Sequence, residues 1–436
     1  MEHRLIIRNL GPIEQVDLTL KDFTVLTGPQ ASGKSTIAKA IFMFRRMKDE
    51  IYDLINRRRL NSEPIAKYSL LGELQWQMNR IFTSSYGPHT AKSPDMNIKY
   101  IWGSTSGGWS IHVEMKIQIN EDVDRRKDLK ILCSRPILEL LSRLEKEWAG
   151  YGMGSLNDQE RKSLREELNR FFHDEYTAVY LPAGRSVVST LAEFFLNQYS
   201  QMSDIEKRTV DYCLQLYLNE VQGAKTSLRD GLVALDQYKT VKTAGAIELA
   251  KHIINQILKG EYKIDNRGYE RLELSNGTFV PIHLASSGQQ ESLWILNLLY
   301  FHLVKNEPRF FIIEEPESHL YPDAQNKIMQ YIALTHNTGH QMLITTHSPY
   351  VLGSLNNLLY AHQVSQKIPE EVERIMPREY WINKEKFMGL HVSHGTVRNA
   401  MEDGLFESSL IDEVSDVIND AFDRLNRLDM GQRGAL

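Results

Sequence analysis

The stretch of sequence that decides the fold is a glycine-containing loop between an apolar run and a helical pattern. It reads Gly28-Pro29-Gln30-Ala31-Ser32-Gly33-Lys34-Ser35-Thr36, a complete G-x-x-x-x-G-K-S sequence. The apolar run at 23–26 predicts a buried strand, and apolar residues at helical spacing over 33–46 predict a helix. Glycines let the N–H groups of such a loop face phosphate oxygens at a helix N-terminus, whose dipole favours anions. We therefore predict that this loop binds phosphate.

Two residues inside the loop have specific expected roles. Lys34 should reach the terminal phosphates of a nucleotide, and the Ser35 hydroxyl should ligate Mg²⁺. The alternative is a plain glycine–serine turn before a helix. The order of strand, loop and helix favours the phosphate-binding interpretation over that alternative.

A second stretch places two adjacent acids at the end of an apolar run. Residues 309–314 predict a central strand that is covered on both faces. Glu314 and Glu315 lie at its carboxyl end, where open α/β sheets bind ligands. Glu314 would support the metal, directly or through water, and Glu315 would orient or deprotonate an attacking water. Two solvated acids after a strand are the alternative, which the phosphate loop in the same chain weakens.

A third stretch begins a helix at 291–303 and carries a family resemblance. It reads Ala285-Ser286-Ser287-Gly288-Gln289-Gln290, which alone is more often a helix N-cap than a ligand site. With the first two stretches, it resembles the ABC-type ATPases of the SMC/RecF/OLD branch. In that family the turn caps its helix and binds the γ-phosphate of the partner subunit, so the resemblance gives Ser286, Gly288 and Gln289 both roles. The family has Leu where Ala285 stands, and often Gly where Ser287 stands.

Further stretches fit the same family. Residues 342–345 predict a strand that leads to His347, which the resemblance makes the switch histidine that contacts the γ-phosphate. A plain polar contact at a strand end is the alternative. Residues 318–322 lie where the family carries its dimer-crossing loop. Arg8 and Asn9 belong to a run that is similar to the opening of this branch, and by resemblance they would help to frame the nucleotide base.

The resemblance implies an α/β fold. We expect an ABC-type ATPase head with a central, mostly parallel sheet and an antiparallel β-subdomain, plus a largely helical insertion. The head is placed at 1–50 and 265–360, and the insertion at 51–264, with a β-hairpin at 96–120. A C-terminal tail at 361–436 is expected to pack on the head and to end in an amphipathic helix, whose apolar face includes Phe422 and Leu425.

Arg185 is a candidate whose role the sequence leaves open. It follows a predicted strand at 178–181, at about the place where the family carries a glutamine loop, but no glutamine is present. Loops after central strands line the ligand edge of a sheet, which favours a phosphate or partner-site contact. A surface salt bridge is the alternative.

Composition narrows the class of protein. With 436 residues, the chain is long enough for two or three units. A net charge of −5 argues against a uniformly basic nucleic-acid coat, although basic stretches at 57–59 and 125–127 could contact phosphates or form solvated faces. The two cysteines lack CxxC spacing, which argues against a cysteine-built zinc site. No signal peptide or long apolar span is present, so we expect a cytoplasmic protein without a membrane segment.

The resemblance also implies a function. Two antiparallel copies would bind ATP and Mg²⁺ between them and hydrolyse ATP to ADP and phosphate. The tail lacks the Asp-x-Asp pair of a Toprim nuclease, so the chain resembles the standalone OLD-like ATPases of the Septu and PARIS phage-defence systems. Those ATPases control a separate nuclease or toxin, which makes such an effector the expected partner. A RecF-like DNA-repair or DNA-end-binding ATPase, with DNA as partner, and a nucleotide-gated scaffold are the alternatives.

Overall fold

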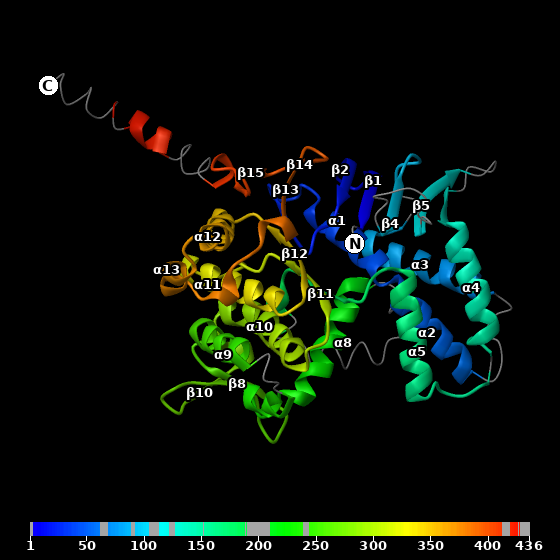
Figure 1. Ribbon diagram of the computed structural model, residues 1–436, viewed down its shortest axis with the longest axis horizontal. Coiled ribbons are helices and arrows are strands. Elements are labelled where there is room, and N and C mark those ends of the chain that lie inside the picture. Colours follow the sequence, from blue (N-terminus) through cyan, green and yellow to red (C-terminus); the bar gives the residue numbers. More distant parts are fainter. Residues whose placement is uncertain are drawn as a thin grey trace.

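A six-stranded sheet forms the centre of the molecule (Figure 1). The computed structural model describes residues 3–61, 69–88, 92–103, 113–121, 127–150, 152–187, 189, 210–238, 244–411, 419–425 and 427. The strand order is β14 (Thr396–Asn399), β13 (Phe387–Ser393), β3 (Phe23–Thr27), β12 (Gln341–Thr346), β11 (Arg309–Glu314) and β7 (Thr177–Leu181). All neighbours are parallel except β13 and β14, which are antiparallel.

The three middle strands are buried because alternate side chains enter two different cores. Leu26, Ile312 and Leu343 lie in one apolar cluster, whereas Val25, Ile313 and Ile344 lie in another. A parallel strand covered on both faces needs apolar residues at every position, which explains the unbroken apolar runs in the sequence. The parallel register also brings the carboxyl ends of β3, β11 and β12 to one edge of the sheet.

A second sheet is antiparallel throughout. Its order is β2 (Ile13–Thr19), β1 (Arg4–Leu10), β4 (Asn97–Trp102), β5 (Val113–Glu121) and β6 (Lys127–Cys133). The predicted hairpin at 96–120 is present as the pair β4 and β5. Helix α1 (Lys34–Arg45) follows β3 and shares the first core with this sheet. The α/β class, with a mostly parallel sheet and an antiparallel subdomain, is therefore confirmed.

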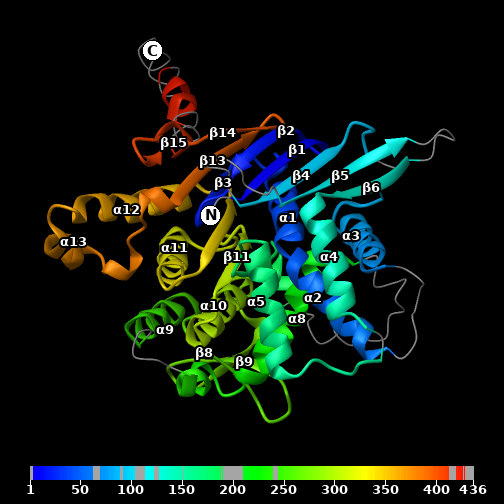
Figure 2. The ribbon, with the colours of Figure 1, turned by 45° about the vertical axis from the view of Figure 1, so that its right-hand side comes forward.

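Helices cover both faces of the six-stranded sheet and one face of the antiparallel sheet (Figures 1 and 2). Those on the side of the first core are α2 (Met47–Leu60), α3 (Leu70–Tyr86), α4 (Arg135–Glu147) and α5 (Asp158–Phe171). The second core is covered by α8 (Tyr212–Ser227), α9 (Ala244–Leu258), α10 (Ser287–Lys305), α11 (Pro322–Asn337) and α12 (Pro349–Ser365). Helix α10 is apolar on almost every side because it is buried between its neighbours.

Short elements complete the fold. A small sheet contains β8 (Glu261–Ile264), β9 (Glu270–Glu273) and β10 (Phe279–Pro281), and a hairpin pairs β15 (Met401–Glu402) with β16 (Leu405–Phe406). Helix α13 (Pro369–Ile375) follows α12. The 3-10 turns are η2 (Leu232–Tyr238), η3 (Ile282–Leu284), η4 (Arg378–Tyr380) and η5 (Lys384–Lys386).

The central sheet takes strands from outside the segments 1–50 and 265–360. Strand β7 comes from the predicted insertion and β13 from the predicted tail, so both segments contribute to the head's sheet. The apolar face predicted at the C-terminus is not buried where it is described, since Phe422 and Leu425 are 62% and 65% exposed. The described residues 419–425 project away from the sheets (Figure 1), and residues 412–418 lie outside the described part.

The basic stretch at 57–59 is largely internal. Arg58 is buried and pairs with Glu145 at 2.8 Å and with Glu73 at 3.1 Å. Arg59 is also buried, and its Nε donates to the Gly154 carbonyl at 3.1 Å. Arg58 and Arg59 therefore form neither a solvated face nor a phosphate contact, the two alternatives for this stretch, because both side chains are buried and bonded to other segments of the chain. The stretch at 125–127 lies outside the residues whose side chains are described.

Candidate nucleotide-binding site

The predicted phosphate loop joins the carboxyl end of β3 to the first turn of α1. Gly28 has φ 144, and a Cβ there would lie 2.2 Å from the Val392 carbonyl oxygen of β13, so a side chain does not fit. Helix α1 begins at Lys34 without a side-chain hydrogen bond at its N-cap, Gly33. Its first N–H groups and its dipole are therefore suited to an anion. Pro29, Gln30, Ala31 and Ser35 are exposed on the surface of this loop.

The Lys34 side chain is hydrogen-bonded to the backbone of its own loop. Its ammonium group donates to the carbonyl oxygens of Gly28 at 2.8 Å and Pro29 at 2.7 Å, and the residue is buried. Burial lowers the pKa of Lys34, and the nearby charges of Glu315, Glu317 and Glu314 oppose that shift. Because the acceptors of the ammonium among the described residues are neutral carbonyls, phosphate oxygens could replace them as stronger, charged acceptors.

Two acids stand at the end of β11, as the sequence predicts. Glu314 is buried and its Oε2 accepts from the backbone N–H of Ala183 at 3.2 Å. Its neighbour Glu315 has φ 42, a left-handed conformation that non-glycine residues rarely adopt. The N–H of Glu315 donates to the Thr345 carbonyl at 2.9 Å, which ties this residue to β12. Such strained backbone often occurs at functional sites.

His347 and Glu315 lie side by side. Nδ1 of His347 is 3.5 Å from Oε1 of Glu315, and Ser318 donates its hydroxyl to Oε2 of Glu315 at 3.3 Å. The hydrogen-bonding imidazole lowers the pKa of the Glu315 carboxyl, and the carboxylate raises the pKa of His347. Glu315 is therefore held ionised, which suits a group that orients water or accepts its proton.

Glu317 is a site residue to which the sequence analysis gave no role. It is buried, and its Oε1 accepts from the Thr346 hydroxyl at 2.6 Å and from the backbone N–H of His347 at 3.1 Å. Glu317 thus holds the end of β12 that carries His347. Its place in Glu-Glu-Pro-Glu, two residues after Glu315, is the signal that could have indicated it.

Three buried oxygen atoms around this edge have no hydrogen-bond partner among the described residues. They are Ser32 Oγ in the phosphate loop, Glu314 Oε1 and Glu317 Oε2. Buried polar atoms are usually satisfied, and carboxylate and hydroxyl oxygens are of the kind that an ion or a water would satisfy. Mg²⁺ usually takes one or two protein oxygens and completes its shell with phosphates and water. Ser35 and Glu314 supply a hydroxyl and a carboxylate of the required kind.

The turn at 285–290, called the signature turn from here on, caps α10. Ser286 Oγ accepts from the Gln289 N–H at 3.4 Å, and Gln289 Oε1 accepts from the Ser286 N–H at 3.0 Å, which forms a capping box. A Cβ on Gly288 would lie 2.8 Å from the His319 carbonyl oxygen, so glycine permits close packing there. Ser286 and Gln289 make no hydrogen bond to residues 28–36. Their N-cap role is thus present, and their ligand role stays a prediction.

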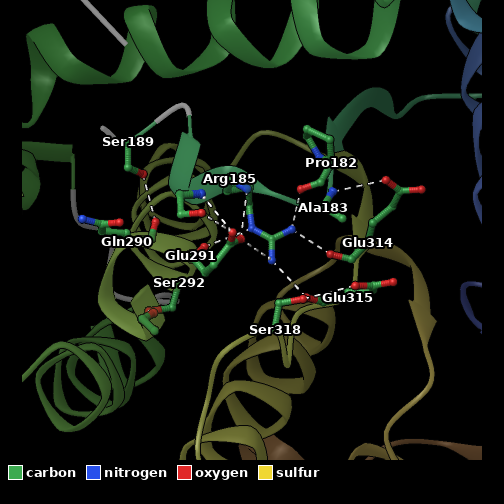
Figure 3. Close-up of polar contacts among 12 residues, drawn as sticks. Pro182, Ala183, Arg185, Ser189, Gln290, Glu291, Ser292, Glu314, Glu315 and Ser318 are labelled. Atoms are coloured by element: carbon green, nitrogen blue, oxygen red, sulfur yellow. Dashed lines mark hydrogen bonds and ion pairs between the residues drawn. The ribbon is translucent and has the colours of Figure 1, made fainter. Parts of the chain in front are cut away.

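The remaining candidates lie in two different environments. Arg8 and Asn9 are exposed on β1. Their contact with a nucleotide base remains a prediction. Arg185 is fully buried and faces Glu291 of α10 and the end of β11, so a surface salt bridge is excluded (Figure 3).

The helices of the described part of the chain include none with the length and apolar character of a membrane span.

Comparison with known proteins gives one family match. Residues 156–352 match the AAA ATPase domain family, which is less than half of the chain and excludes the phosphate loop. The match includes Glu314, Glu315, the signature turn and His347, and it supports an ATPase domain. No curated protein matches.

Solved structures of SMC head domains are distantly similar. An SMC head bound to the C-winged helix domain of ScpA has 12% identity and a TM-score of 0.38, covering 91% of this chain and 96% of that chain. The SMC head domain from Thermotoga maritima has 11% identity and a TM-score of 0.38, covering 92% and 99%. A head with an extended coiled coil bound to the C-terminal domain of ScpA, derived from Pyrococcus furiosus, has 11% identity and a TM-score of 0.37, covering 91% and 95%.

Proposed function

We propose that this chain is an ATP-binding and ATP-hydrolysing switch that dimerises around ATP and controls a separate effector protein. One observation carries the proposal. The carboxyl edge of the central sheet brings together a phosphate loop, a buried lysine that is held by neutral carbonyls, and the Glu315–His347 pair.

Each residue has a defined task in the proposed reaction. The loop and Lys34 would hold the phosphates, and Ser35 and Glu314 would hold Mg²⁺, which neutralises charge on the phosphates when bound. Glu315 would accept a proton from water as its oxygen bonds to the γ-phosphorus. The bond from that phosphorus to the bridging oxygen of ADP would then break. His347, held by Glu315, would donate a hydrogen bond to the γ-phosphate oxygens.

The signature turn would complete the site of a second copy. Ser286 is exposed, so it is available to the γ-phosphate of a partner subunit. Three large apolar side chains close in sequence to residues of the proposed site are also exposed: Leu284 at 69%, Tyr321 at 80% and Tyr350 at 57%. Exposed aromatic and apolar residues beside a polar site are typical of an interface. Dimerisation would cover them.

One observation weighs against the RecF-like, DNA-binding alternative. Arg58 and Arg59 are buried with acidic partners, which removes most of one basic stretch from the surface available to DNA. A nucleotide-gated scaffold, which would hydrolyse ATP only to reset itself, would use the same residues. The resemblance of the sequence to standalone OLD-like ATPases is the reason for assigning the switch to the control of a separately encoded nuclease or toxin, in phage defence or a toxin–antitoxin-like system.

The test is ATP turnover by the purified protein, measured across protein concentrations and at several salt concentrations, with and without duplex DNA. Lys34→Ala is the blank, and it should lose ATP binding by about 100-fold or more because the charged phosphate contact disappears. We expect turnover per chain to rise with protein concentration and to be indifferent to DNA. Strong, salt-sensitive stimulation by DNA would replace the effector proposal with the DNA-binding alternative. Equal turnover in Lys34→Ala would contradict the assignment of the site.

A further inference from the structure

Arg185 occupies a fully buried position between two parts of the proposed site (Figure 3). Its guanidinium donates through Nη1 to the carbonyl oxygens of Pro182 at 2.5 Å and Glu314 at 2.7 Å, and through Nη2 to that of Glu315 at 3.0 Å. Nε donates to the Glu291 carbonyl at 3.0 Å. Only arginine offers a planar fork with enough donors for such a set of acceptors.

Glu291 balances the charge of Arg185 and anchors the loop that carries it. Its carboxylate lies 3.5 Å from Nη2 of Arg185 and accepts from the backbone N–H groups of Arg185 and Ser186, each at 3.0 Å. The Ser186 hydroxyl also donates to Glu291 at 2.7 Å. The loop after β7 is therefore fixed to the first turns of α10 through a buried, hydrogen-bonded ion pair.

On its other side, Arg185 holds the backbone of the proposed catalytic residue. The left-handed conformation of Glu315 needs support from its surroundings, and its peptide receives that support at both ends. Its N–H donates to the Thr345 carbonyl of β12, and its carbonyl accepts from Arg185 and from the backbone N–H of Ser318 at 3.1 Å. The direction of the Glu315 side chain toward His347 depends on this backbone.

Helix α10 begins at the surface where a second copy would dock. Ser286 and Gly288 lie in the signature turn, and Glu291 lies about one turn further along the same helix. Gly288 also packs against the carbonyl of His319, just after the acids. A shift of the first turn of α10 therefore acts directly on Glu291, and Glu291 is bonded to Arg185.

We propose that Arg185 is a positioning residue that couples the signature turn to Glu315 within one subunit. When the turn engages the nucleotide of a second copy, Glu291 and Arg185 transmit the position of α10 to the Glu315 backbone and align its carboxylate for hydrolysis. This inference rests on the proposed function, because it concerns the alignment of the residue that activates water. It assigns to Arg185 no contact with ATP.

The test compares Arg185→Lys with Arg45→Lys in the full-length protein. Arg45 is also a buried arginine in an ion pair, with Asp174 at 2.6 Å, but it lies at the opposite edge of the sheet. The measurements are the melting temperature, the dissociation constant for ATP, and kcat across protein concentrations. We expect Arg185→Lys to keep its ATP affinity within about threefold and to lose at least about tenfold in kcat, because small misplacements of catalytic groups are costly. Its kcat should also respond little to protein concentration, whereas Arg45→Lys should retain the wild-type response.

Glu291→Gln makes the test independent of how well Arg185→Lys folds. It keeps the length of the side chain and one acceptor oxygen but removes the charge, so a smaller kcat loss at unchanged ATP affinity is expected. Wild-type kcat in Glu291→Gln, or equal kcat in Arg185→Lys and Arg45→Lys, would overturn the inference while the ATPase proposal stands. Absence of turnover in the wild-type protein would instead contradict the ATPase proposal itself.

Discussion

The two edges of the central sheet both bury charged side chains, but they satisfy them differently. At the amino edge, where the parallel strands begin, Arg45 pairs with Asp174 at 2.6 Å and donates to the Gln341 side chain at 2.9 Å. Lys48 donates to the Asn169 side chain at 2.9 Å and lies 3.7 Å from Asp174. At the carboxyl edge, the Lys34 ammonium is held by the backbone carbonyls of Gly28 and Pro29 and, among the described residues, by no carboxylate. The cations at the amino edge are paired with an acid of the protein, whereas the ammonium at the carboxyl edge can receive a charged ligand.

The histidines at the two edges show the same contrast. Burial lowers the pKa of His3 to about 3 and that of His340 to about 3, and both lie near the amino edge. At the carboxyl edge, Glu315 raises the pKa of His347, which is half-exposed. The comparison teaches that burial of charge does not by itself identify a functional site. A buried ammonium held by neutral carbonyls and a partly exposed histidine paired with an acid do so better.

The largest expected effect on stability comes from breaking the closed cluster. Although burial alone would raise the pKa of the Asp174 carboxyl, the charges of Arg45 and Lys48 hold it below its usual value. Arg45→Met should lower the free energy of unfolding at pH 7 by about 3–5 kcal/mol, because a buried carboxylate loses its main partner. Urea unfolding measures this loss, and ATP affinity should not change. Adding Asp174→Asn should restore part of the stability, and a double mutant no better than the single one would contradict this explanation.

Protonation of His3 at low pH is expected to change the free energy of unfolding by a smaller amount. The ordinary pKa of histidine is near 6.5, so the unfolded chain takes up a proton at His3 as the pH falls below that value, while the folded chain stays neutral until about pH 3. His3 therefore stabilises the fold above pH 6.5, and this contribution is lost between pH 6.5 and about 3. His3→Phe should remove about 2 kcal/mol of the stability loss between pH 7 and pH 5. Denaturant unfolding at the two pH values measures it, and an unchanged pH dependence would show that His3 is not buried neutral.

The smallest effect on stability is expected at the carboxyl edge. His347 is 47% exposed and 3.5 Å from Glu315, so the pair is screened by solvent. His347→Asn should change the free energy of unfolding by less than about 1 kcal/mol. It should nevertheless lower ATP turnover by about tenfold or more, because a donor to the transferred phosphate is lost. A loss of stability as large as that of Arg45→Met would erase the contrast between the two edges.

Much of the fold could be predicted because its signals are local. The apolar runs before Glu314 and His347 predicted central strands, and the loop before Lys34 predicted a strand–loop–helix unit, as the structure has them. The strand at 178–181 was predicted and is present as β7, but the pairing of β7 with β11 and the place of β13 beside β3 could not be predicted, since they join segments more than a hundred residues apart. For the same reason the sequence left Arg185 open. Its acceptors come from the strand end at 314–315 and from α10.

The most direct test of the central claim is a comparison of Glu315→Gln with the wild-type protein by ATP turnover and by molecular mass in solution with ATP and Mg²⁺. Glutamine keeps the size of the side chain but cannot accept a proton from water, so hydrolysis should fall by about 100-fold or more. ATP binding should remain, and the variant should accumulate as an ATP-bound dimer while the wild-type protein returns to its nucleotide-free state. Wild-type turnover in Glu315→Gln, or a monomer at saturating ATP, would contradict the account of an ATP-gated dimer.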